Sequence, residues 1–100
     1  MEVMVDVRHN QERSRYEIFL DGQPIGHLAY RVDGDTVITP HTEIDPAHEG
    51  HGYASQLVAA ALDDIRGTGR QVQPVCSFVR RFISLRPEYQ DLVKLSLIHI

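Results

Sequence analysis

The sequence is poor in features that hold a protein in a membrane or cross-link it covalently. Of its 100 residues only Cys76 is a cysteine, so no internal disulfide can form, and this favours a reducing, cytoplasmic setting. No apolar run approaches the about 20 residues that span a bilayer, and the stretch MEVMVDVRHN alternates apolar and charged residues, unlike a secretion signal. The histidines lack the spacing of a zinc site. We therefore expect a cytoplasmic protein with no metal and no membrane partner.

The net charge is small and negative, and it is unevenly distributed. A formal charge of −4 argues against general nucleic-acid binding. Residues 1–64 carry twelve acids and four arginines, whereas residues 65–86 carry five arginines and no acid. These arginines are Arg66, Arg70, Arg80, Arg81 and Arg86. The basic segment is either part of a site for an anionic ligand or a solvated face, and the sequence leaves both open.

Alternating apolar residues predict four antiparallel strands in the first half of the chain. The alternation covers residues 3–7, 16–20 and 28–32, and TVITPHTEI predicts a fourth strand over residues 36–44. Turn residues separate the strands, with DGQPIG after the second and Asp33-Gly34-Asp35 after the third. The first half therefore predicts an antiparallel meander.

The hydrophobic period changes after residue 50. Six apolar residues recur at helical spacing and predict an amphipathic helix of about four turns, ended by Gly67 and Gly69. They are Ala54, Leu57, Val58, Ala61, Leu62 and Ile65. QVQPVC predicts a short fifth strand. SFVRRFISL predicts a second helix with Ser77 as its N-cap, an apolar stripe of Phe78, Phe82 and Leu85, and Val79 and Ile83 beside that stripe. Arg86-Pro87 ends it.

These elements predict one small domain of the α/β class (α+β mixed), with a mixed, mostly antiparallel sheet of about five strands and two main helices. Strand four, the first helix and strand five form a βαβ unit, so those two strands should run parallel. The last six residues, LSLIHI, match the translated end of a transposon adaptor used in sequencing libraries. We therefore expect the domain to span residues 1–94 and residues 95–100 to be a non-native tail.

The stretch HEGHGYAS, residues 48–55, stands at the start of the first predicted helix. Gly50 and Gly52 leave the backbone bare there, and free N–H groups at a helix N-terminus bind anions such as phosphate. A nucleoside-triphosphate loop would need a lysine, which Gly52-Tyr53-Ala54 lacks. The dinucleotide pattern G-x-G-x-x-G fails only at Ser55, but the expected later acid and a second nucleotide-binding half are missing.

A third pattern fits this loop better. Acetyl-coenzyme A transferases of the GNAT superfamily carry Arg/Gln-x-x-Gly-x-Gly/Ala between strand four and the next helix, where this chain has Glu49-Gly50-His51-Gly52-Tyr53-Ala54. With HTEI, PVCSFV and RPEYQDLV, residues 2–93 resemble the small, single-domain YjdJ-like branch of that superfamily. Members of that branch commonly carry Glu in place of the first Arg/Gln, so Glu49 is compatible with the resemblance.

The resemblance implies a GNAT-like fold in which strands four and five splay apart and hold the pantetheine arm of coenzyme A. The thioester would then lie between residues 41–44 and residues 75–76. The pyrophosphate would bind the loop N–H groups and the helix dipole. The expected coenzyme A-binding residues are Ile44, Glu49, Gly50, His51, Gly52, Tyr53, Ala54 and Ser55.

Three residues are candidates for the chemistry of acetyl transfer to an amine. His41 and Glu43 lie on the same side of strand four, and either could remove a proton, although both could be ordinary strand polar residues. Cys76 precedes a helix N-terminus, where the dipole lowers a thiol pKa. It could accept the acetyl group or protonate the leaving thiolate, or it could be an inert core cysteine.

The sequence thus predicts an acetyl-CoA-dependent N-acetyltransferase acting on an unidentified amine. One alternative is a non-catalytic acyl-CoA binding or sensing module, because the domain is minimal. Another is a structural domain whose glycines only form a tight turn. The amine acceptor and the oligomeric state cannot be read from the residues.

Overall fold

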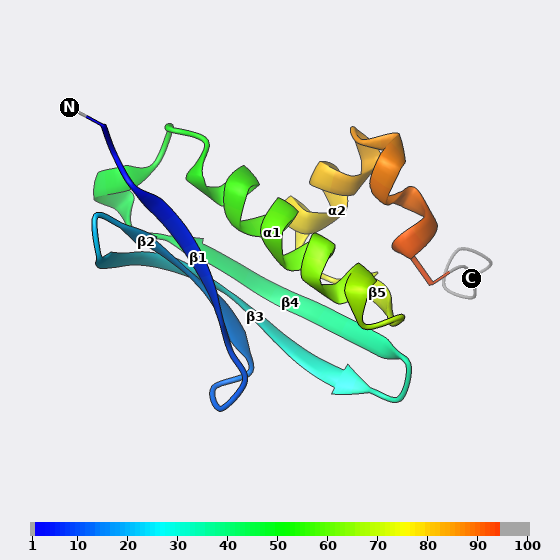
Figure 1. Cartoon of the computed structure of the whole chain (residues 1–100). Coiled ribbons are helices and arrows are strands. Elements are labelled where there is room, and N and C mark those ends of the chain that lie inside the picture. Colours follow the sequence, from blue (N-terminus) through cyan, green and yellow to red (C-terminus); the bar gives the residue numbers. More distant parts are fainter. Residues whose placement is uncertain (1, 95–100) are drawn as a thin grey trace.

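The computed structural model describes residues 2–94, which form a five-stranded sheet with helices against it (Figure 1). The predicted non-native tail, residues 95–100, lies outside the described residues. The elements in chain order are β1 (Val5–Asn10), β2 (Arg15–Leu20), β3 (Gln23–Asp33), β4 (Thr36–Ile44), the 3₁₀ helix η1 (Pro46–His48), α1 (Tyr53–Gly67), β5 (Gln71–Pro74), α2 (Ser77–Ser84) and the 3₁₀ helix η2 (Pro87–Leu92).

The sheet has the order β1-β2-β3-β4-β5. The first four strands pair antiparallel, and β4 pairs with β5 in parallel, so the predicted meander, the βαβ unit and the fold class are confirmed. The predicted bounds of β4 are also confirmed. Buried and partly buried side chains alternate in β2, with the period of two that the sequence predicted.

The third strand is longer than the sequence predicted. Asp21 and Gly22 both have positive φ, 50° and 83°, and form a two-residue turn that lets β3 begin at Gln23. DGQPIG is therefore a short turn followed by strand. The register between β2 and β3 shifts after Ile18, which accommodates Pro24 and turns Ile25 into the core, where it is only 3% exposed.

The second predicted helix also differs in detail. Ser77 is its first residue, and Cys76 holds the N-cap position with extended backbone, so Ser77 is not the N-cap. β5 ends at Pro74, two residues earlier than QVQPVC suggested, because the chain turns after Pro74 and Cys76 is already the N-cap of α2. The buried stripe of α2 is Val79, Phe82 and Ile83, whereas Leu85 is 65% exposed.

Helix α1 lies across the sheet and covers the core (Figure 1). Its predicted apolar face is confirmed by Leu57, Val58, Ala61, Leu62 and Ile65, which are all buried. They pack with buried residues of β2, β3 and β5 and with the apolar side of α2. Each Leu or Ile side chain buried this way contributes about 1.5–3 kcal/mol. This packing fixes the start of α1 beside the end of β4.

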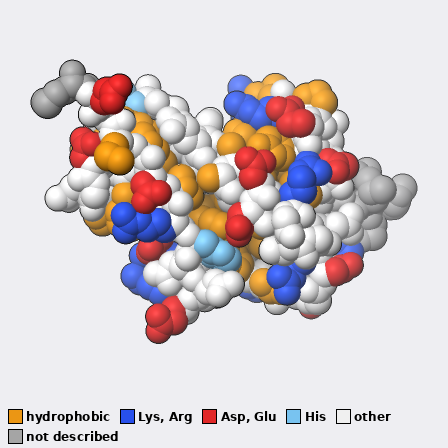
Figure 2. Space-filling view, viewed as in Figure 1, with side chains coloured by type: hydrophobic (Ala, Val, Ile, Leu, Met, Phe, Trp, Pro, Cys, Tyr) orange, Lys and Arg blue, Asp and Glu red, His pale blue; other side chains and the backbone are white. Residues whose placement is uncertain are grey.

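The described chain ends beside β5. Val93 forms a parallel bridge with Val72, and the Lys94 N–H donates to the Val72 carbonyl at 3.0 Å. Acidic and basic side chains are interspersed over the face shown in Figure 2, with apolar side chains between them. Among residues 2–94, no helix has both the length and the apolar character needed to cross a membrane.

Candidate functional site

The parallel strands β4 and β5 separate at one end of the sheet. Their pairing runs from Thr36 with Gln71 to Thr39 with Pro74, and the Cys76 N–H then donates to the Thr39 carbonyl at 2.8 Å. Beyond that point β4 continues to Ile44, while the chain after β5 turns into α2. Residues 41–44 of β4 thus face a gap of the kind that the GNAT resemblance implied.

The loop before α1 ends in two residues with left-handed backbone. Gly50 has φ 82°, and Gly52, the N-cap of α1, has φ 79°. A Cβ atom added at either glycine would meet no atom within 4 Å. Glycine is therefore favoured at these positions by the positive φ, and not by a lack of space for a side chain. The bare backbone also leaves free space beside the loop for a ligand.

The first turn of α1 carries unsatisfied donors. No side chain caps this end of the helix, and its first turn contains no acidic residue. The N–H groups of residues 53–55 have no intrahelical acceptor, because the first carbonyl in reach, that of Gly52, accepts from Gln56 at 3.1 Å. The partial positive charge of the helix end adds to these donors. This end of α1 can therefore accept an anion.

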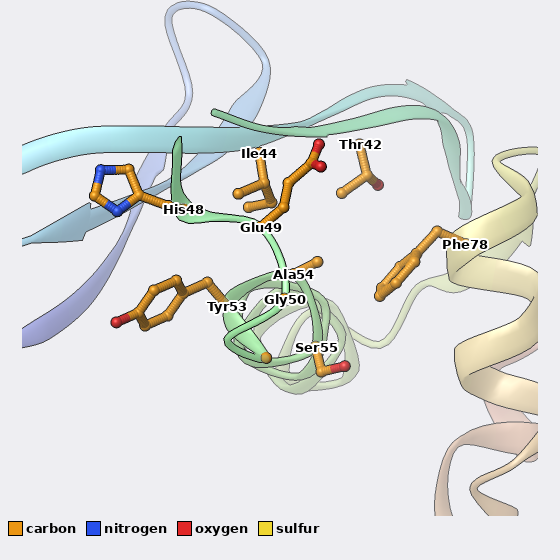
Figure 3. A pocket seen from close by; sticks show the side chains of 10 residues that line it. Thr42, Ile44, His48, Glu49, Gly50, Tyr53, Ala54, Ser55 and Phe78 are labelled. Atoms are coloured by element: carbon orange, nitrogen blue, oxygen red, sulfur yellow. The ribbon is translucent and has the colours of Figure 1, made fainter. Parts of the chain in front are cut away.

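A pocket of about 430 Å³ joins this loop to the gap beside β4 (Figure 3). Its lining residues are Thr42, Ile44, His48, Glu49, Gly50, Gly52, Tyr53, Ala54, Ser55 and Phe78. They include every predicted coenzyme A-binding residue except His51, whose ring centroid lies 5.8 Å from that of Tyr53. In Figure 3 the Glu49 side chain extends from the loop toward β4, near Thr42, and away from the start of α1.

Three lining residues were not predicted for the site. Thr42 and His48 are adjacent in the sequence to predicted site residues, and this adjacency is the signal that could have identified them. Phe78 was predicted as part of an apolar stripe of α2, and it is 38% exposed and faces the pocket from α2 (Figure 3). The helical period alone could not distinguish these roles, because either assignment keeps Phe78 on an apolar face.

Cys76 lies at the inner end of the gap. Its Sγ is 3.5 Å from the Thr42 Oγ1, across the separated strands. Burial opposes ionisation of the thiol, but hydrogen bonds from the Thr42 hydroxyl and from the N–H groups of Val79 and Phe78 outweigh it and lower the Cys76 pKa. The pKa is thus shifted in the direction that the sequence predicted, with the Thr42 hydroxyl as the largest lowering cause and the helix N–H groups next. The catalytic role of Cys76 stays a prediction.

His41 and Glu43 point away from the pocket. They alternate along β4 with Thr42 and Ile44, which line it, so they project from the other face of the sheet. The His41 Nε2 lies 3.3 Å from the Glu43 Oε1, and both side chains are more than half exposed. Their predicted common side is confirmed. The structure does not bring them together with Cys76 in one cluster.

A third polar residue joins His41 and Glu43 on the open face. His27 pairs directly with Glu43 across β3 and β4, and its ring centroid is 6.0 Å from that of His41. Burial, and then the nearby Arg15 charge, lower the His27 pKa below its ordinary value. Sequence reasoning missed His27 because its link to β4 is a cross-strand register.

The basic segment divides into two parts. Arg66 binds the Asp91 carboxylate at 2.8 and 3.1 Å, and Arg70 donates to the Gly34 carbonyl at 3.4 Å. Both arginines lie at the far end of α1, about 20 Å from Gly52 at the rise of an α-helix. They are not placed to hold a phosphate at the loop. Arg80 and Arg81 of α2 lie nearer, two and three residues after Phe78.

Among the described residues 2–94, no group of three or more His, Cys, Asp or Glu side chains could hold a metal ion. What the pocket offers is backbone donors at one end, an apolar wall of Ile44 and Phe78, and a thiol of lowered pKa beyond Thr42. A long ligand with a phosphate at one end and an apolar arm fits this order of groups.

Several solved structures share this fold. A GCN5-like protein from Staphylococcus aureus, solved by NMR in solution, has a TM-score of 0.69 and 20% identity, covering 89% of this chain and 87% of its own. N-acetylglutamate synthase from Neisseria gonorrhoeae, complexed with coenzyme A and N-acetyl-glutamate, has a TM-score of 0.67 and 15% identity, covering 86% of this chain and 28% of its own.

The PaiA N-acetyltransferase from Thermoplasma acidophilum, in complex with coenzyme A, has a TM-score of 0.56 and 13% identity, covering 60% of this chain and 38% of its own. No curated protein sequence matches the chain. The sequence model of the GCN5-related N-acetyltransferase family, however, matches residues 15–92. Because this match covers well over half of the chain, the protein belongs to the GCN5-related N-acetyltransferase family, a family of acyltransferases.

Proposed function

We propose that this protein transfers the acetyl group of acetyl-CoA to an amine, as a member of the YjdJ-like branch of its family. The observation that carries the proposal is the pocket between the end of β4 and the start of α1. It combines an uncapped helix N-terminus and two left-handed glycines with a gap between parallel strands. We infer that the pyrophosphate of coenzyme A binds the N–H groups of residues 50–55 and that the pantetheine arm follows β4.

The proposed reaction is attack of a neutral amine on the thioester carbonyl. A C–N bond forms, the C–S bond breaks, one proton leaves the amine nitrogen, and the coenzyme A thiolate takes up one proton. Cys76 is the candidate for the group that protonates the thiolate or first accepts the acetyl group. His41 or Glu43 is the candidate base, and acts from the opposite face of β4, where an amine would approach.

A non-catalytic acyl-CoA binding module is the second candidate function. The observation that favours it is the exposure of His41 and Glu43, which lie outside the pocket with more than half of each side chain open to water. Both functions need coenzyme A in the pocket, so binding alone does not distinguish them. Turnover does.

The test is release of free coenzyme A thiol from acetyl-CoA with a panel of amines: a polyamine, a small primary amine, a lysine side chain and a peptide N-terminus. We expect thiol release that depends on one class of amine and is lost in Gly52→Val, which obstructs the loop. Calorimetric binding of coenzyme A without turnover on any amine would favour the binding module. An absence of binding would overturn both.

The role of Cys76 has a separate test. Intact-mass analysis after incubation with acetyl-CoA alone should reveal one added acetyl group if Cys76 carries it, and Cys76→Ala should lose that species. If the protein is not acetylated and the Cys76→Ala variant remains active, direct attack of the amine on acetyl-CoA is the remaining mechanism. Alkylation of Cys76 should in either case be slowed by bound coenzyme A, because the pantetheine arm would cover the thiol.

A further inference from the structure

A second cluster of titratable side chains lies far from the pocket, where β1, β2, β3 and α1 meet. The His9 Nε2 is 2.5 Å from the Tyr30 Oη, and the His9 Nδ1 is 3.3 Å from the Asp64 Oδ2. The same carboxylate oxygen accepts from the Tyr16 hydroxyl at 2.6 Å, and the His9 ring stacks on Tyr16 at 4.3 Å. These contacts bring Tyr30, His9, Tyr16 and Asp64 together in one cluster.

The backbone around this cluster is irregular in two places. The register between β3 and β4 shifts between Ala29 and Arg31, so that Tyr30 of β3 lies opposite two residues of β4, Thr39 and Pro40. Ser14, in the turn between β1 and β2, has a positive φ of 51°. Its carbonyl accepts from the Tyr30 N–H at 3.0 Å, so the two irregular positions are joined. Such features occur often at ligand sites.

A cavity of about 400 Å³ opens beside this cluster of His9, Tyr16, Tyr30 and Asp64. Its lining residues are His9, Gln11, Ser14, Tyr16, Tyr30, Arg31, Val32, Val37, Ile65, Thr68 and Arg70. Its volume is within the range of about 300–1,000 Å³ typical of small-molecule sites. The apolar part of its wall is formed by Val32, Val37 and Ile65.

The charged side chains in the wall are all basic. Arg31 and Arg70 line the cavity, and among the described residues no Asp or Glu does. This is notable in a chain of net charge −4. The Arg70 Nε donates to the Gly34 carbonyl, which orients its guanidinium and leaves its other N–H groups for a ligand. Arginine guanidinium groups bind carboxylates through paired, charge-assisted hydrogen bonds.

Tyr30 also lines the cavity, and its hydroxyl lies 2.5 Å from the His9 Nε2. Burial, and then the Asp64 charge, raise the Tyr30 pKa, which keeps this hydroxyl protonated.

We propose that this cavity is a second ligand site, for a small carboxylate with an apolar body. The carboxylate binds Arg31 and Arg70, while the apolar body contacts Val32, Val37 and Ile65. The site is independent of acetyl transfer.

The experiment is an NMR chemical-shift titration of the isotope-labelled full chain with benzoate at constant ionic strength. We expect saturable shifts at the amides of Ser14, Tyr30, Arg31 and Thr68. Benzyl alcohol, which keeps the ring without the charge, should bind about tenfold more weakly or worse. Arg70→Gln and Arg31→Gln should each weaken benzoate binding about five- to tenfold, whereas Arg80→Gln on α2 should not change it.

The proposal is overturned by unsaturable shifts, by equal binding of benzyl alcohol, by shifts confined to residues 50–55, or by benzoate binding that Arg70→Gln and Arg31→Gln leave unchanged.

Discussion

The Sγ of Cys76 and the Oγ1 of Thr42 lie 3.5 Å apart across the point where β4 and β5 separate. Cys76 comes from the segment after β5 and Thr42 from β4, so the contact exists only because the parallel pair ends three residues before Thr42. It joins the wall of the pocket to the one thiol of the chain and contributes to the lowered pKa of that thiol.

The first prediction concerns this contact. Thr42→Val removes the hydroxyl that donates to the thiolate, so the Cys76 pKa should rise and the thiol should react several-fold more slowly with iodoacetamide near neutral pH. Thr42→Ser keeps the hydroxyl and should react at a rate close to that of the unchanged protein. The pH profile of alkylation measures both. Equal profiles for the valine and serine variants would mean that the backbone hydrogen bonds of Val79, Phe78 and Thr42 lower this pKa without the hydroxyl.

The second prediction concerns Gly52 and has a matched control in the same chain. Gly52 and Gly34 both have positive φ, 79° and 61°, and a Cβ at either meets no atom within 4 Å. Alanine at each should therefore cost a similar free energy of unfolding, about 1–2 kcal/mol, from backbone strain. Only Gly52→Ala should also weaken coenzyme A binding, because Gly34 lies in the β3–β4 turn.

Urea denaturation and calorimetry would measure these two effects. If both variants bind coenzyme A as the unchanged protein does, the assignment of the pyrophosphate to the loop is wrong. If both bind more weakly in proportion to their lost stability, the effect of Gly52→Ala is structural and says nothing about the phosphate.

The third prediction concerns Glu49, whose carboxylate lines the pocket. Coenzyme A is anionic, so Glu49→Gln should strengthen its binding by about two- to threefold through the loss of like-charge repulsion. Glu88→Gln, on η2 at a distance from the loop, should leave the affinity unchanged. Weaker binding of the Glu49 variant would instead indicate that the carboxylate accepts hydrogen bonds from the pantetheine amides, consistent with its direction toward β4 in Figure 3.

The fourth prediction separates the arginines. Arg80→Gln and Arg81→Gln should reduce both the affinity for coenzyme A and its decrease with rising salt, because α2 begins beside the pocket. Arg66→Gln should change neither, since its guanidinium binds Asp91 at the other end of α1. Calorimetry at low and moderate ionic strength provides the measurement. If the affinity of the unchanged protein does not depend on salt, Arg80 and Arg81 are solvated surface residues that do not contribute to coenzyme A binding.

The sequence by itself determined the elements and much of the loop that we propose for coenzyme A. Apolar periods of two and of 3.6 predicted the bounds of β4 and the buried face of α1, because these patterns reflect which side chains face the core. The paired glycines before the helix predicted an anion site, since few other residues adopt that backbone. These features are local, so a single stretch of chain contains the information.

The tertiary structure decided the features that depend on contacts between distant segments. The short turn at Asp21-Gly22 and the shift in register buried Ile25, and the packing of α2 on α1 turned Phe78 toward the pocket. Cys76 contacts Thr42, and His9 contacts Tyr30 and Asp64. The members of these pairs are separated by between 21 and 55 positions in the sequence. No local pattern encodes such pairs, because strand register and helix packing, set by burial of the whole core, bring them together.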